Sequence, residues 1–325
     1  MAQRGYDRST WVLGTIALAL AIGLMAVHDG CSARQKVVIG YSRLRISLPI
    51  FVAAQQGYFK AEELDVDLVP FDTAQPLIEA LVAGHIQGGG FTAFPITFNA
   101  MLRSNTALYF VGLLVEDQAH PISMLLKRKD APIKTIADLK GKRIGILPTI
   151  AYRAWLEFIL RQNGVEPHEV TIVQVQPLLT PSAFANGQID AAFTNDPAAT
   201  AALQTGSAEL VTPEALVPKY LWSPFPFGAF NVRKDFADAH PAVVRKIVHA
   251  LNRAIDDVNT SPVMAKELMK AYVLEEQRRF VPFYPDALYV PSHQVEEHDL
   301  HKVGQSYLEM RIIDRPIRVD GLVYR

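Results

Sequence analysis

Apolar residues occur along the chain in short runs that are separated by amphipathic segments. Four runs in the first third have the length of a strand, and they span residues 36–41, 65–71, 86–91 and 107–115. The segment from Pro49 to Gly57 begins with proline and ends with glycine, which is typical of a helix. A second helical face ends at Gly84. Strands that alternate with single helices predict parallel pairing and therefore an α/β sheet.

A second series of the same kind begins near Pro121. Its expected strands span residues 122–127, 142–147, 170–175 and 189–193, and a return strand follows at 227–232. A short helix is expected at residues 136–140. A longer helix has a predicted apolar face formed by Ala151, Trp155, Phe158 and Ile159.

The rest of the chain is mostly helical in its pattern. Pro241 opens a helix with an apolar stripe formed by Val244, Ile247, Val248, Leu251 and Ile255. We interpret this stripe as core packing rather than as a partner surface.

Two segments of the chain echo each other. Residues 84–95 and 187–197 both have a helix-ending glycine, a strand, a Phe-Thr pair, two further residues and a proline. The echo is open to three interpretations: chance, two ordinary strand-to-helix turns, or two lobes that each present a threonine turn to a ligand. We favour the third, because ligands of open α/β sheets bind at the carboxyl ends of the strands. The bare run Gly88–Gly90 fits a close approach of the backbone to a ligand or to the opposite lobe.

The N-terminus has the pattern of an export segment. Arg4 and Arg8 precede an unbroken apolar run from Trp11 to Val27, and Gly30 and Cys31 follow shortly after it. This order predicts a bacterial lipoprotein that is lipidated at Cys31. An uncleaved signal anchor and an ordinary signal peptide are the alternatives. In each case we expect the bulk of the chain outside the cytoplasmic membrane. Our expectation is a protein in the periplasm or at the cell surface that its lipid or anchor tethers to the cytoplasmic membrane.

Composition narrows the possible functions. The chain has 325 residues, half of them apolar, which is enough for about two domains. Lys and Arg total 32 and Asp and Glu total 33, and this balance argues against a nucleic-acid partner. The single cysteine excludes an intramolecular disulfide, an iron–sulfur cluster and a multi-cysteine zinc site. His293, His298 and His301 fit a solvated polar helix better than a metal site, so we expect no metal and no other cofactor.

The candidate binding residues lie on four loops that follow predicted strands. They are Ser42, Arg43 and Ser47, with Arg45 between them; Phe91 and Thr92; Thr149 and Tyr152; and Thr194, Asn195 and Asp196. Thr92, Thr149 and Asp196 have two possible roles, as helix caps and as ligand contacts, because the two positions coincide on such loops. The arginines suit an anionic group, whereas Asp196 suits an amine or a ring that carries N–H groups. We interpret Trp222, Phe225 and Phe227 as packing near the return strand rather than as stacking on a ligand.

Several short segments also match a known family in their order and spacing. They are Gly57-Tyr58-Phe59, residues 64–68, residues 80–84, residues 138–145, Phe236 and His240-Pro241. Together they resemble the exported solute-binding proteins of nitrate-, sulfonate- and taurine-type ABC transporters, in a superfamily that also includes thiamine-pyrimidine synthase-like proteins. The chain departs from the family at Gln87, where an acidic residue is common.

This resemblance implies a two-lobed α/β fold of the periplasmic-binding-protein type II, with a ligand cleft between the lobes. Residues 1–35 are then a leader or anchor, residues 36–120 and 229–325 form lobe 1, and residues 121–228 form an inserted lobe 2. The crossings between the lobes are expected near residues 119–125 and 224–229.

The implied function is the capture of a small organic solute by lobe closure and its delivery to an ABC permease and its ATPase. A sulfonate, a nitrate-like anion and a pyrimidine or other aromatic compound are the expected solute classes. We expect a monomer that is not an enzyme. The alternatives are an enzyme of the thiamine-pyrimidine synthase type, whose cysteines this chain lacks, and an anchored extracytoplasmic sensor.

Overall fold

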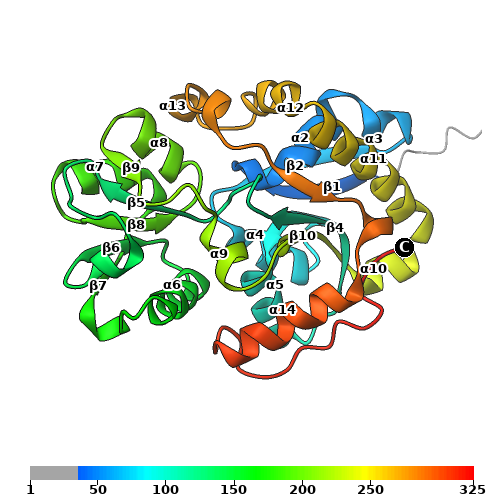
Figure 1. The fold of residues 1–325 in the computed structure, drawn as a ribbon. Coiled ribbons are helices and arrows are strands. Elements are labelled where there is room, and N and C mark those ends of the chain that lie inside the picture. The colour runs from blue at the N-terminus through cyan, green and yellow to red at the C-terminus, as the bar shows by residue number, and fades with distance from the viewer. Residues whose placement is uncertain (1–35) are drawn as a thin grey trace, which may run out of the picture. The chain divides into compact units, whose positions relative to one another are not determined.

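The computed structural model describes residues 36–325 (Figure 1). The expected leader, including Cys31, lies outside this range. Within it, no helix combines the length and the apolar character that crossing a membrane requires.

A mixed sheet of six strands forms the first half of the architecture that residues 36–325 adopt. The strand order is β11-β4-β10-β3-β1-β2. The bounds are β1 Lys36–Ser42, β2 Asp65–Phe71, β3 Gly88–Ala93, β4 Leu108–Glu116, β10 Phe225–Arg233 and β11 Leu288–Val290. Strand β1 pairs in parallel with β2 and β3, as the alternation of strands and helices predicts. The prediction is wrong for β10, which enters between β3 and β4 from the opposite direction and runs antiparallel to both.

The second sheet has five strands within the described range, in the order β7-β6-β8-β5-β9. The bounds are β5 Met124–Arg128, β6 Arg143–Ile146, β7 Thr171–Gln174, β8 Ala191–Thr194 and β9 Ala208–Leu210. All five strands come from the chain between the end of β4 and the start of β10 (Figure 1). Strand β10 begins at Phe225, so residues 225–228 belong to the first sheet, whereas the sequence assigns them to the inserted lobe. The division into two lobes that close on a ligand stays a prediction.

Helices cover the sheets and supply most of the apolar contacts. Their bounds are α2 Leu48–Gln55, α3 Tyr58–Ala61, α4 Ala74–Val82, α5 Phe94–Ser104, α6 Ile150–Gln162, α7 Thr180–Ala185, α8 Ala198–Gln204, α9 Leu216–Tyr220, α10 Lys234–Ala239, α11 Pro241–Thr260, α12 Pro262–Met269, α13 Glu275–Arg278 and α14 Glu297–Glu309. Helix α11 packs against α2 and α3, while α4 and α5 contact each other and β3. The whole predicted stripe of α11 is buried, which confirms that it packs in the core.

The buried face of helix α6 agrees with the predicted apolar face at three of its four residues. Ala151, Trp155 and Ile159 are buried as predicted, and Leu156 lies beside them. Phe158 is only half-buried, so its place on the apolar face is wrong. The buried face of α6 repeats at i, i+1, i+4 and i+5, and Phe158 falls at its border.

The glycine run of β3 serves packing. A Cβ atom at Gly88 would lie 2.7 Å from the Phe230 ring. One at Gly90 would lie 2.3 Å from Cδ1 of Ile50 and 2.9 Å from the backbone oxygen of Gly40. These positions are bare because helix α2 and the neighbouring strand press against β3. The close approach is therefore to the protein's own core, and the expected approach to a ligand or to the opposite lobe is wrong.

Candidate functional site

The two Phe-Thr pairs lie at corresponding places in the two sheets, but their phenylalanines serve the core. Phe91 in β3 is fully buried, with its ring centroid 5.0 Å from that of Tyr289. Phe193 in β8 is also fully buried, 5.2 Å from the Tyr152 ring. Phe91 is thus committed to packing, and its role as a ligand contact stays a prediction without structural support.

The Thr92 hydroxyl is hydrogen-bonded within the first sheet. Its Oγ1 lies 2.7 Å from the Oγ1 of Thr97 and accepts a hydrogen bond of 2.8 Å from Nδ2 of Asn231. The N-cap of helix α5 is Ala93, so the expectation that Thr92 caps this helix is wrong. The hydroxyl group that the sequence predicts as a ligand contact is thus hydrogen-bonded to Thr97 of α5 and Asn231 of β10.

The corresponding threonine of the second sheet has a different environment. The Oγ1 of Thr194 is buried and has no hydrogen-bond partner within residues 36–325. Asn195 follows it and is half-buried. Thr194 therefore keeps a polar atom that is free to bond a ligand.

The two carboxylate oxygens of Asp196 have different environments. Oδ1 accepts hydrogen bonds from the Thr200 backbone N at 3.2 Å and from the Thr200 Oγ1 at 2.5 Å, which fixes the first turn of α8. Oδ2 lies 3.5 Å from an Nη of Arg45 but has no hydrogen-bond partner in the described part of the chain. The N-cap residue of α8 is Pro197, so the N-cap role predicted for Asp196 is wrong, although its Oδ1 still bonds the third residue of the helix and its other oxygen remains without a partner within residues 36–325.

Arg45 joins four distant segments. One of its terminal nitrogens donates to the carbonyls of Pro285 at 2.8 Å and Asp286 at 3.1 Å. The other donates to the carbonyl of Pro121 at 3.0 Å and forms the ion pair with Asp196. The side chains of Arg45 and Asp196 are only 7% and 2% exposed. This buried ion pair connects the loop after β1 with the end of β8.

The other polar residues predicted on the loop after β1 are Ser42, Arg43 and Ser47. The Oγ atoms of Ser42 and Ser47 lie 3.3 Å apart, and both residues are buried. Arg43 is half-buried. Within this loop, it is Arg45 that reaches the second sheet.

The third predicted loop combines a cap with a buried phenol. Oγ1 of Thr149 accepts a hydrogen bond of 3.2 Å from the Tyr152 backbone N at the start of α6, which confirms the capping role. The Tyr152 hydroxyl is buried and lacks a partner among the residues that the structure describes. Burial, and then the charge of nearby Glu116, raise the pKa of Tyr152 well above its usual value, so the phenol stays neutral.

Glu116, at the end of β4, is a site residue that the sequence reasoning missed. Its Oε1 accepts hydrogen bonds from the Ile122 backbone N at 2.7 Å, the Ser123 backbone N at 2.5 Å and the Ser123 Oγ at 2.7 Å. Its Oε2 is buried without a partner within the described range. Burial raises the pKa of Glu116 to about 7, while the hydrogen bonds from Ser123 and Ile122 and the charge of Arg45 act in the opposite direction. An acidic residue as the last residue of an otherwise apolar strand is the signal that could have found it.

Two tyrosines from the C-terminal part lie near these residues. The Tyr289 hydroxyl donates to the backbone carbonyl of Arg45 at 2.8 Å. Tyr284 is buried, and burial followed by the charge of Asp196 raises its pKa above the usual value. We name Arg45, Glu116, Tyr152, Asp196 and Tyr284 the junction cluster.

The other predicted features fit structural roles. Phe225 and Phe227 are buried, and their ring centroids lie 5.8 and 6.0 Å from that of Trp155, so packing is confirmed for both. His301 lies 3.0 Å from Asp320. In residues 36–325, no group of three or more His, Cys, Asp or Glu side chains is arranged to hold a metal ion.

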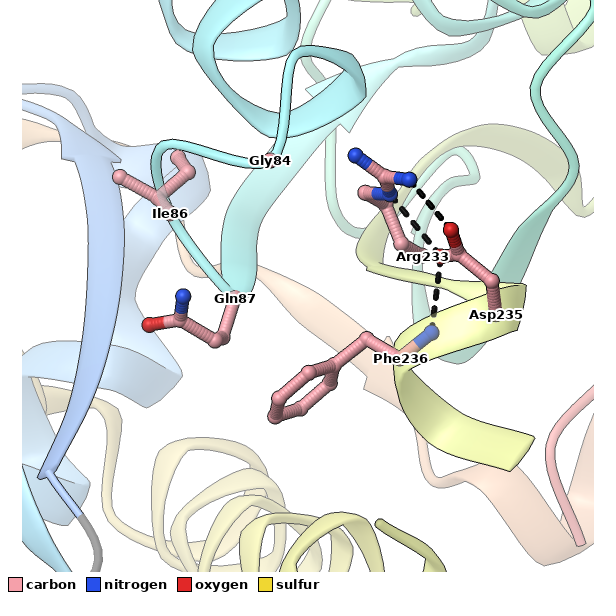
Figure 2. Close-up of a pocket in the computed structure, with 6 residues that line it drawn as sticks. All are labelled: Gly84, Ile86, Gln87, Arg233, Asp235 and Phe236. Carbon is pink, nitrogen blue, oxygen red and sulfur yellow. Dashed lines mark hydrogen bonds and ion pairs between the residues drawn. The ribbon is translucent and has the colours of Figure 1, made fainter. Parts of the chain in front are cut away.

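A surface pocket of about 270 Å³ lies at the start of β3, whereas Thr92 lies near the end of that strand (Figure 2). Its lining residues are Gly84, Ile86, Gln87, Arg233, Asp235 and Phe236. Arg233 is paired with Asp235 and donates to the Val82 carbonyl at 3.1 Å, and the Gln87 Oε1 accepts from the Val38 backbone N at 2.9 Å. Its polar side chains are thus already bonded within the protein, and the pocket is separate from the junction cluster.

Comparison with known proteins identifies the family. The family described as NMT1/THI5-like matches residues 46–265, and the chain belongs to it. The taurine-binding periplasmic protein of Escherichia coli K12 is 30% identical over 59% of this chain and 57% of its own length. The nitrate/nitrite binding protein NrtA of Nostoc sp. PCC 7120 is 24% identical over 67% of this chain and 53% of its own length. The chain thus spans little more than half the length of these relatives.

Solved structures confirm the expected fold class. The alkanesulfonate-binding protein SsuA of Xanthomonas axonopodis pv. citri, bound to MOPS, matches with a TM-score of 0.69. It is 22% identical, and the match covers 90% of this chain and all of that one. The desulfurization enzyme DSZB matches with a TM-score of 0.67 at 16% identity, over 89% of this chain and 96% of the enzyme. The fold therefore serves both binding proteins and an enzyme.

Proposed function

We propose that this protein is the extracytoplasmic solute-binding component of an ABC importer. Membership of the NMT1/THI5-like family and the likeness to taurine-, nitrate- and alkanesulfonate-binding proteins support the proposal. The observation that carries it is the junction cluster, where buried polar atoms from both sheets meet around one ion pair. Polar atoms that are buried and unpaired are costly, and a bound solute that pairs with them recovers that cost.

Binding without turnover is part of this proposal. The members of the junction cluster are carboxylates, phenols and a guanidinium that the protein holds with its own carbonyls. Residues 36–325 contain no cysteine, so cysteine nucleophiles of any kind are excluded from this part of the chain. The proposal therefore differs from the enzyme alternative in a measurable way, because the solute should be recovered unchanged.

Titration of the purified protein with a panel of small solutes tests this function. The panel holds alkanesulfonates, nitrate, aminopyrimidines and aromatic acids. We expect saturable binding of one class, unchanged solute after prolonged incubation, and a smaller radius of gyration in small-angle scattering at saturation. Conversion of the bound solute would support an enzyme, and the absence of binding by every class would contradict the importer role.

Export and tethering are a further part of the proposal. Arg4, Arg8, the apolar run to Val27 and Gly30-Cys31 support a lipoprotein signal. Cys31→Ser in a native-like host should abolish lipid labelling and release the protein from the membrane fraction. Unchanged labelling and fractionation would leave the signal-anchor alternative.

A further inference from the structure

Asp196 holds one carboxylate oxygen that the protein does not use. Its side chain is 2% exposed, and Thr200 bonds only Oδ1. Oδ2 has no hydrogen-bond donor within residues 36–325. A carboxylate oxygen accepts up to two hydrogen bonds, and leaving a buried one unbonded is costly.

The nearby arginine does not satisfy this oxygen. Arg45 directs its donors at the carbonyls of Pro121, Pro285 and Asp286, and its nearest approach to Oδ2 is 3.5 Å. The guanidinium therefore supplies positive charge beside Asp196, while the lone pairs of Oδ2 stay available. Three of the five N–H donors of Arg45 are thus committed to backbone carbonyls.

Three further polar atoms of the cluster region lack partners within residues 36–325. Glu116 Oε2, the Tyr152 hydroxyl and Thr194 Oγ1 are buried, and the described chain offers none of them a partner. The hydroxyls and a protonated carboxyl can accept as well as donate, whereas an ionised carboxylate such as that of Asp196 only accepts. A ligand that brings N–H donors matches this set, whereas one with acceptors alone leaves Asp196 unpaired.

We propose that Asp196 Oδ2 accepts a hydrogen bond from an amino group of the solute, and that the site therefore selects amine-bearing solutes over isosteric amine-free ones. This inference rests on the solute-binding function proposed above. An ammonium on a flexible chain and the amino group of a heterocycle share the required chemistry.

Two isosteric pairs of probes separate these sources. Taurine is compared with propane-1-sulfonate, and 4-amino-2-methylpyrimidine is compared with 2,4-dimethylpyrimidine. In each pair a methyl group replaces the amino group at nearly constant volume. In titration calorimetry, the amino member of at least one pair should bind roughly ten- to a hundredfold more tightly to the wild-type protein. This comparison needs no variant.

A matched pair of variants assigns the preference to one residue. Asp196→Asn keeps the size and places an amide where the carboxylate was, so the preference should fall to less than about threefold. Asp190→Asn is the control, because Asp190 precedes β8, bonds Arg143 at 2.8 Å and should retain the full preference. Circular dichroism checks that both variants fold.

The outcomes separate this inference from the underlying function. Equal or tighter binding of the amine-free members, or a preference that survives Asp196→Asn, would overturn the inference and leave solute binding intact. Failure of both amino probes at millimolar concentration would also overturn it. Failure of the whole solute panel would overturn both.

Discussion

The two echoed turns have nearly the same sequence but different chemistry. In the first sheet, Thr92 is held by Thr97 and Asn231, and the glycines before it are pressed by helix α2. In the second sheet, Thr194 has no partner among residues 36–325, and Asp196 beyond it keeps a free oxygen. A shared pattern of strand and turn therefore specifies backbone geometry, whereas neighbours from distant segments decide which copy keeps unpaired polar atoms.

The largest effect is expected at the ion pair that connects the two sheets. Arg45→Leu leaves the carbonyls of Pro121, Pro285 and Asp286 without their donor and leaves Asp196 as a buried charge without its partner. We expect the free energy of unfolding to fall by about 3–5 kcal/mol in chemical denaturation.

Arg43→Leu is the matched control for this variant. Arg43 is half-buried, and the described chain shows no hydrogen bond or ion pair to its guanidinium. Its replacement should change stability by less than about 0.5 kcal/mol. Equal losses in the two variants would contradict the special role of Arg45.

Glu116, at the end of β4, should make the free energy of unfolding depend on pH. Its pKa is raised to about 7 in the folded protein, so the folded state binds a proton that the unfolded state has released above about pH 4.5. Stability from this group is therefore complete below pH 4.5, is lost as pH rises towards 7 and above, and differs by on the order of 3 kcal/mol across that window.

Glu116→Gln should remove this slope when unfolding is measured at several pH values. Glu169→Gln is the control, because a hydrogen bond from the Glu166 backbone N lowers the pKa of Glu169 and gives its contribution the opposite sign. A pH dependence that is the same in wild type and Glu116→Gln would show that Glu116 titrates normally.

A glycine-to-alanine exchange tests the packing difference between the two turns. Gly90 of β3 corresponds to Ala192 of β8 in the echoed segments. Gly90→Ala should cost about 1–3 kcal/mol because the new methyl group meets Ile50 and the Gly40 backbone. The reciprocal Ala192→Gly should cost about 1–2 kcal/mol, because it adds backbone entropy to the unfolded chain and removes a buried methyl group. An unchanged free energy of unfolding in Gly90→Ala would mean that helix α2 shifts to accommodate the new methyl group.

At the first threonine we expect a loss of stability without a loss of solute affinity. Thr92→Val removes the hydroxyl that accepts from Asn231, although Asn231 also donates to the Ala229 carbonyl at 2.7 Å. We expect a loss of about 1 kcal/mol without ligand and nearly unchanged solute affinity. A large loss of affinity with an unchanged melting temperature would restore Thr92 as a ligand contact.

The sequence predicts the fold better than the site, for physical reasons. Strand positions and the α11 stripe follow from local periodicity, so they are recognised one segment at a time. The antiparallel direction of β10 depends on how the chain returns from the second sheet, which no local pattern records. The choice of Arg45 over Arg43 and the burial of Glu116 depend on contacts with residues up to 241 positions away. The cap formed by Thr149 was predictable because capping is itself local.

Titration calorimetry of Thr194→Val, beside Thr92→Val, with the tightest-binding solute of the panel tests the central claim most directly. The account predicts that Thr194→Val loses roughly ten- to a hundredfold in affinity and keeps the wild-type melting temperature without ligand. Wild-type affinity in Thr194→Val, together with lost affinity in Thr92→Val, would contradict the claim that the end of β8 holds the solute.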